Sequence, residues 1–153
     1  MNLIRRLLPE VRVLVATFWV GSIWAIGYVA APALFANLDN RTLAGDAAGH
    51  LFRAQALVSI SCGFTLLALL ISSRDLIAVR CRTSMWLVVF MLSCTLLVYF
   101  GLQPIMSAMR EAAGSEGVLA SASRSRFGAL HGIAASLQLL QSLAGVWLVL
   151  RIR

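Results

Sequence analysis

The chain has 153 residues, of which 60% are hydrophobic, and its formal net charge at pH 7 is +7. Soluble domains contain roughly 45–50% apolar residues, so this composition excludes a soluble globular domain and indicates a membrane protein. All 13 basic residues are arginines. Because they gather at the ends of apolar runs, they are typical of membrane orientation signals, and we expect no nucleic-acid partner.

The first apolar run covers residues 13–38 and contains no charged side chain. About 20 residues of helix, at roughly 1.5 Å each, cross a hydrocarbon core of about 30 Å, so this run is long enough to span a membrane. It is also longer than the roughly 7–15 apolar residues of a signal peptide, which favours a retained span. Pro32, near the end of the run, predicts a kink where neighbouring helices pack.

Three further apolar runs cover residues 54–73, 84–106 and 127–150. Lipid offers the backbone no hydrogen bonds, so each run is expected to cross the membrane as a helix. The connections between the runs are short, which favours antiparallel neighbours. We therefore predict an all-α polytopic membrane protein, in which residues 1–153 form a single four-transmembrane-helix antiparallel bundle in contact with the lipid bilayer.

The arginines are distributed unequally between the two predicted sides of the membrane, and the richer side is expected to be cytoplasmic. This places both termini in the cytoplasm. The richer side carries Arg5, Arg6, Arg12, Arg74, Arg80, Arg82, Arg151 and Arg153, and the other side carries Arg41, Arg53, Arg110, Arg124 and Arg126.

Polar side chains recur at helical spacing along one face of each span. A lipid-facing surface needs no polar atoms, so these stripes are expected to converge inside the bundle, in its outer half. We predict a polar pocket that opens outward, although the same groups can instead serve only as hydrogen bonds between helices. The predicted pocket residues are Tyr28, Gln55, Gln103, His131 and Gln138, with Arg53 and Arg126 at the rim.

His131 and His50 are predicted near the outer ends of two different spans, with Met106 at a similar depth. Two histidines on separate helices can ligate a haem iron, and histidine with methionine suits copper. Haem or copper is therefore a candidate cofactor. The alternatives are a helix-terminal histidine bonded to a carbonyl, an exposed loop histidine and a packing methionine.

Small residues follow the fourth predicted span as Gly128, Gly132 and Ser136, at intervals of four. This spacing lets another helix backbone approach closely. The partner is either another span of the same chain, a second copy in a homo-oligomer, or a membrane partner protein.

Several segments together resemble a bacterial family called domain of unknown function 4149, whose relatives include the eukaryotic transmembrane protein 205. The resemblance is carried by Gly27-Tyr28, Ala31-Pro32 and Leu34-Phe35 in the first span, by Gln103-Pro104 in the third, and by Phe127 with Leu130-His131-Gly132 in the fourth. It implies four spans and a bacterial inner membrane, and it brings no settled biochemical function.

A more distant similarity links the pattern to copper-resistance D-type proteins and to the haem-containing membrane protoporphyrinogen oxidase. The oxidase-like pattern implies a histidine in the first span, and this sequence has none there.

Three functions are consistent with these patterns. The first is a non-enzymatic protein that binds or passes a small ligand or metal ion in an outward-facing pocket. The second is a haem- or copper-dependent membrane oxidoreductase using His131 and His50. The third is a structural subunit of a membrane complex. The sequence contains no hydrolytic triad or phosphate loop, and no Asp or Glu lies within a span.

Overall fold

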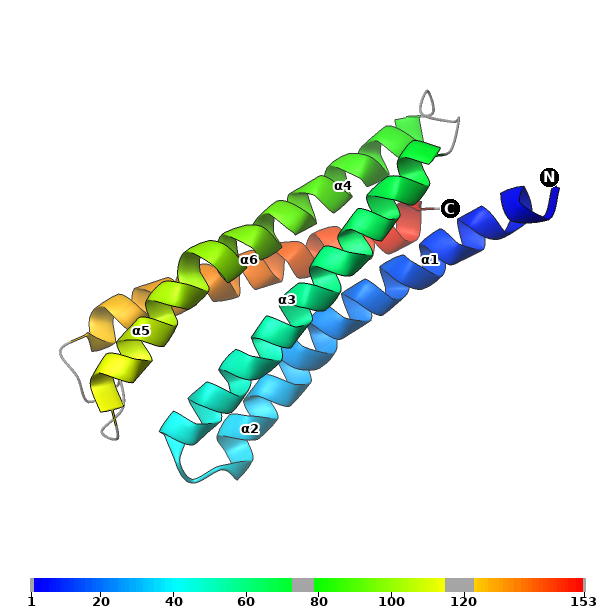
Figure 1. Ribbon diagram of the computed structural model, residues 1–153. Helices are drawn as coiled ribbons and strands as arrows, with labels where there is room; N and C mark the ends of the chain where they lie inside the picture. Colours follow the sequence, from blue (N-terminus) through cyan, green and yellow to red (C-terminus); the bar gives the residue numbers. More distant parts are fainter. Residues whose placement is uncertain (1, 73–78, 115–122, 153) are drawn as a thin grey trace.

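The computed structural model describes residues 2–72, 79–114 and 123–152 (Figure 1). These ranges are helical almost throughout and contain no strand. Two of the four long helical segments are interrupted by π-helical stretches. The elements, in chain order, are α1 (Asn2–Trp24), η1 (Ala25–Ala30), α2 (Ala31–Asn37), α3 (Arg41–Ser72), α4 (Val79–Leu96), η2 (Leu97–Leu102), α5 (Gln103–Ala113) and α6 (Arg124–Arg151).

Four segments of the described chain are long and apolar enough to cross a membrane. Each overlaps one of the predicted runs, and Ser73, the predicted end of the second span, lies outside the described residues. The predicted all-α four-span fold is therefore confirmed, and the protein is a multi-pass membrane protein. The segments are Leu7–Asn37, Arg41–Ser72, Cys81–Ala113 and Arg124–Arg151.

The four spans stand at the corners of an antiparallel bundle. Helix α3 packs against α1 and α4, and α6 packs against the same two helices from the other side. Helices α1 and α4 are therefore diagonal neighbours. Both chain ends lie at one end of the bundle, whereas α2 and α5 lie at the opposite end (Figure 1).

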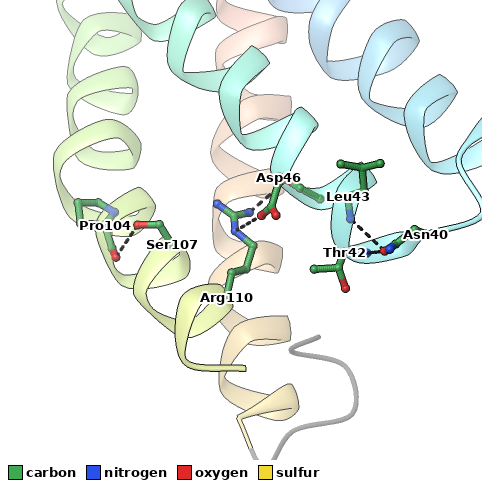
Figure 2. Close-up of polar contacts among 8 residues, drawn as sticks. Asn40, Thr42, Leu43, Asp46, Pro104, Ser107 and Arg110 are labelled. Atoms are coloured by element: carbon green, nitrogen blue, oxygen red, sulfur yellow. Dashed lines mark hydrogen bonds and ion pairs between the residues drawn. The ribbon is translucent and has the colours of Figure 1, made fainter. Parts of the chain in front are cut away.

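Helix α3 begins at Arg41, well before the predicted start of the second span. The Asn40 side chain explains this start, because its Oδ1 accepts hydrogen bonds from the backbone N–H groups of Thr42 at 2.9 Å and Leu43 at 3.1 Å (Figure 2). These bonds satisfy two donors that the first turn of a helix leaves free. Charged residues in the segment 41–53 end the apolar run, but they do not prevent a helix.

Each π-helical stretch comes just before a proline: η1 precedes Pro32 and η2 precedes Pro104. Proline has no N–H, and its ring collides with the carbonyl four residues earlier in an α-helix. Those carbonyls belong to Tyr28 and Phe100, which lie inside the π stretches. A wider turn accommodates the ring, so both spans continue through their prolines.

The core is apolar and gathers toward the end of the bundle that holds the termini. Trp19, Leu66, Met91 and Leu148 are fully buried there and come from all four spans. Large apolar side chains on the outer surface, by contrast, are suited to contact lipid. They include Leu14, Phe18, Phe64, Trp86, Phe100, Leu143 and Leu150.

Candidate functional site

A small cavity lies between α3, α6 and the span formed by α4, η2 and α5. Its volume is about 30 Å³, which is room for one or two water molecules. Four glutamines contribute to its wall, so we call it the glutamine cavity. Its lining residues are Phe52, Gln55 and Ala56 from α3, Thr95 from α4, Val98 and Tyr99 from η2, Gln103 from α5, and Gln138 and Gln141 from α6.

Three of the four glutamines donate hydrogen bonds through their amide nitrogens. Gln141 Nε2 donates to the Met91 carbonyl at 3.1 Å and to Thr95 Oγ1 at 2.8 Å. Gln138 Nε2 donates to the Ile23 carbonyl at 3.1 Å. Gln55 Nε2 lies 2.6 Å from Ser59 Oγ.

The backbone contacts determine which way two of these amides face. A main-chain carbonyl can only accept, so the nitrogens of Gln138 and Gln141 must point at it and their oxygens must point elsewhere. Within the described part of the chain, these two side-chain oxygens accept no hydrogen bond. Gln103, which also lines the cavity, makes no side-chain hydrogen bond to a described residue. The cavity wall therefore carries amide groups with unused capacity to accept.

A second group of polar contacts joins α6 to the first span. Tyr28 Oη donates to Ser142 Oγ at 2.9 Å, and Ser142 Oγ in turn donates to the Gln138 carbonyl at 2.8 Å. Gly27 leaves the necessary space, since a Cβ there would lie 2.6 Å from Gln138 Nε2. These contacts hold η1 against α6 beside the cavity.

An ion pair closes the seam between α3 and α5 at the end of the bundle away from the termini. Arg110 Nε lies 3.8 Å from Asp46 Oδ1, and Arg110 Nη1 donates to the Gly45 carbonyl at 3.5 Å (Figure 2). The guanidinium rests on Gly49, where a Cβ would lie 3.0 Å from Nη2. We call this contact the Arg110–Asp46 clasp. Arg110 follows the cavity residue Gln103 by seven positions, about two helical turns on the same face.

The structure brings three of the predicted pocket residues together, since Gln55, Gln103 and Gln138 all line the cavity. Tyr28 contacts α6 but stays 47% exposed. The other predicted residues are exposed and do not line the cavity: His131, Arg126 and Arg53.

Sequence reasoning missed Gln141 and Phe52 as cavity residues. Gln141 follows Gln138 by three positions and so shares its helical face, which was a usable signal. Phe52 carried no such signal, because it comes before the predicted start of the second span.

The residues predicted to hold a metal do not gather around one point. His50 is exposed on α3, His131 is exposed on α6 with its ring stacked on Phe127 at a centroid distance of 6.3 Å, and Met106 is buried on α5. Among the residues that the structure describes, no group of three or more His, Cys, Asp or Glu side chains is placed to hold a metal ion. Metal binding stays a prediction.

The small residues of α6 face away from the bundle. A Cβ added at Gly128 or Gly132 would meet no atom within 4 Å, and Ser136 is exposed with its hydroxyl bonded to the Gly132 carbonyl at 2.9 Å. The face that they form is therefore not used within the described part of this chain.

A family model matches residues 14–115, about two thirds of the chain, and it carries the description Domain of unknown function (DUF4149). The chain belongs to this family. The predicted resemblance is thereby confirmed. The comparisons with curated proteins and with solved structures found no match.

The DUF4149 match ends before α6 begins. It includes the second and third spans and all but the start of the first, and with them the cavity residues Gln55 and Gln103 and the clasp residues Asp46 and Arg110. Gln138, Gln141 and His131 lie outside it. The protein is thus an integral membrane protein of the DUF4149 family whose candidate site combines residues inside and outside the matched region.

Proposed function

We propose that this DUF4149 protein binds, and in its open form passes, a small solute that donates hydrogen bonds in the glutamine cavity. The observation that carries the proposal is the orientation of Gln138 and Gln141. Their nitrogens donate to main-chain carbonyls, while their oxygens accept no hydrogen bond from a described residue. An acceptor within a membrane bundle is costly without a donor, so a donor-bearing solute or water is the natural partner.

The residues that line the cavity favour a neutral or singly charged solute over a divalent metal ion. Among the residues that the structure describes, no Asp, Glu, His, Cys, Lys or Arg lines the cavity. A neutral or singly charged donor fits such a wall better than a divalent metal ion, whose sites usually include a carboxylate, an imidazole or a thiolate.

The size of the cavity implies that one helix must move before anything larger than water enters. Helix α5 is the natural candidate, because η2 and Pro104 separate it from α4, and among the described residues its polar contact with α3 is the weak Arg110–Asp46 clasp. The arginines predict that the termini lie in the cytoplasm, and the family resemblance implies a bacterial inner membrane. In that orientation this opening faces outward.

Binding is testable by saturation-transfer NMR on the detergent-purified protein with urea, glycerol and ammonium as probes. We expect at least one probe to bind saturably and Gln103→Leu to weaken it about two- to tenfold, the range for one lost hydrogen bond. Gln103 is the best position because it makes no other side-chain hydrogen bond to a described residue. Asn37→Leu, which removes an exposed amide outside the cavity, is the control. Saturable binding of none of the probes, or equal weakening in both variants, would contradict the proposal.

A structural subunit is the second candidate, because the Gly128, Gly132 and Ser136 face of α6 is open to another helix. The oxidoreductase hypothesis gains no comparable support, since His50 and His131 are both exposed.

A further inference from the structure

A groove runs along the seam between α1 and α3, away from the glutamine cavity. Its volume is about 410 Å³. Leu14 and Phe18 form its outer walls and are mostly exposed, so the groove opens on the surface that faces lipid. The lining residues are Leu14, Val15 and Phe18 from α1, and Ser61, Cys62 and Thr65 from α3.

The groove is apolar in spite of its two hydroxyl residues. Thr65 Oγ1 donates to the Ser61 carbonyl at 2.8 Å, so its hydroxyl is satisfied within α3. Cys62 is buried at the floor and behaves as a small apolar residue. Ser61 is exposed, but the accessible wall of the groove is almost entirely apolar. A surface of this kind binds hydrocarbon.

Arg12 lies at the end of the same seam, toward the end of the bundle that holds the termini. It precedes Val15 by three positions, and its Nη2 donates to the carbonyl of Leu69, four positions after Thr65, at 2.9 Å. One helical turn therefore separates the guanidinium from the groove on both helices.

The Arg12 guanidinium keeps binding capacity after this contact. The hydrogen bond to Leu69 uses one of its five N–H donors, and the side chain as a whole is only partly buried. The Nε is buried without a partner among the described residues, so the donors that a ligand can reach are those of the two terminal nitrogens. Among the residues that the structure describes, no carboxylate lies within ion-pair distance of it. A cation without a carboxylate partner, one turn from an apolar groove, is complementary to a molecule with an anionic head and a hydrocarbon chain.

We propose that Arg12 and the α1–α3 groove form a binding site for an anionic phospholipid. The phosphate accepts hydrogen bonds from the Arg12 guanidinium, whose planar fork suits phosphate oxygens. One acyl chain lies in the groove between Phe18 and Thr65. Arg12 directly precedes the apolar run 13–38, so we expect it near the depth where a lipid phosphate meets the hydrocarbon.

Native mass spectrometry of the full chain tests this site, using phosphatidylglycerol and phosphatidylcholine with identical acyl chains. One arginine at the headgroup level favours an anionic lipid about fivefold, so we expect the first phosphatidylglycerol to bind about fivefold more tightly than the first phosphatidylcholine. Arg12→Gln should remove this preference and Arg12→Lys should retain most of it. Arg82→Gln is the control, because it removes an exposed arginine of α4 at the same end of the bundle as Arg12. It should leave the preference for phosphatidylglycerol unchanged.

The groove is tested separately with Thr65→Trp, which fills it without touching Arg12. This variant should weaken the first bound lipid of either class. Equal affinity of the wild type for the two lipids overturns the proposal, and so does an equal loss in Arg12→Gln and Arg82→Gln. Disulfide-linked dimers of a Thr65→Cys chain lacking the other cysteines would show that a second copy occupies the groove, which also overturns it. If Arg12→Gln does not fold, the lipid preferences of the wild type and of Arg12→Lys, which keeps the positive charge, still test the proposal.

Discussion

The orientation of the Gln138 and Gln141 amides follows from the atoms that their nitrogens contact. The stripe of polar residues on the fourth span was readable from helical spacing, and it led to Gln138. The sequence could not show that the amide nitrogens would be used on the carbonyls of Ile23 and Met91, because that depends on how α6 sits against α1 and α4. His131 shows the reverse case. It lies on the same predicted stripe, yet only the part of α6 from Gln141 onward has buried residues.

Glycines differ sharply in what surrounds them, and Gly63 gives a direct test. A Cβ at Gly63 would lie 2.5 Å from Leu92 Cγ, whereas a Cβ at Gly132 meets nothing within 4 Å. We therefore expect Gly63→Ala to destabilise the bundle by about 1–3 kcal/mol through overpacking of α3 against α4. Gly132→Ala is the control and should not lower stability, since alanine is the better helix former.

Unfolding of the purified protein by increasing denaturing detergent measures both variants. Similar midpoints for Gly63→Ala and the wild type would mean that α3 and α4 pack less closely than the structure shows.

At the scale of helices, hydrophobic run length was sufficient to predict four spans but not their full extent. The apolar run gives the part of a helix that lipid must surround, and α3 extends beyond it because Asn40 satisfies its first turn. The π stretches η1 and η2 were also beyond prediction. Sequence shows that Pro32 and Pro104 must be accommodated, but the same signal fits a proline with or without a π-helical turn before it. The kink predicted at Pro32 stays a prediction.

The start of α3 depends on one side chain, so Asn40→Ala should cost about 1 kcal/mol of stability, the usual value of an N-cap. Asn37→Ala is the matched control. Asn37 is also an exposed asparagine with a helix contact, donating to the Ala33 carbonyl at 2.8 Å at the end of α2, but it caps no free N–H. The two variants are compared by their midpoints of unfolding in denaturing detergent. An equal loss of stability in both variants would show that the Asn40 cap does not stabilise α3.

At the scale of the whole molecule, the large buried apolar side chains gather near the termini, whereas the other end buries mainly small ones such as Ala31, Ala44 and Ala48 and carries the polar contacts. The apolar core lies at the first end, and the glutamine cavity and the clasp lie toward the second. Such a division lets one end open while the other stays intact. Composition predicted the bundle, but the division depends on which side chains α5 places against α3, and so it required the structure.

The clasp makes a last prediction about access to the cavity. The Arg110 side chain is 20% exposed and that of Asp46 is 54% exposed, and exposed ion pairs contribute about 0.2–1 kcal/mol, so the clasp can open at little cost. A chain without Cys62, Cys81 and Cys94 and with Gln55→Cys reports on this opening through its rate of reaction with a membrane-impermeant thiol reagent. We expect Asp46→Asn to raise that rate by up to about fivefold, the factor that corresponds to 1 kcal/mol.

Asp39→Asn is the control for this measurement, because it removes an exposed carboxylate just before α3 that belongs to no ion pair with a described residue. It should leave the rate unchanged, and the exchange of charges in Asp46→Arg with Arg110→Asp should bring the rate back toward that of the parent chain. Equal rates in the two asparagine variants would mean that the clasp does not control the cavity. The solute would then have to enter between other helices. The contacts of η2 with its neighbours would be the next to test, since Val98 and Tyr99 of that stretch line the cavity directly.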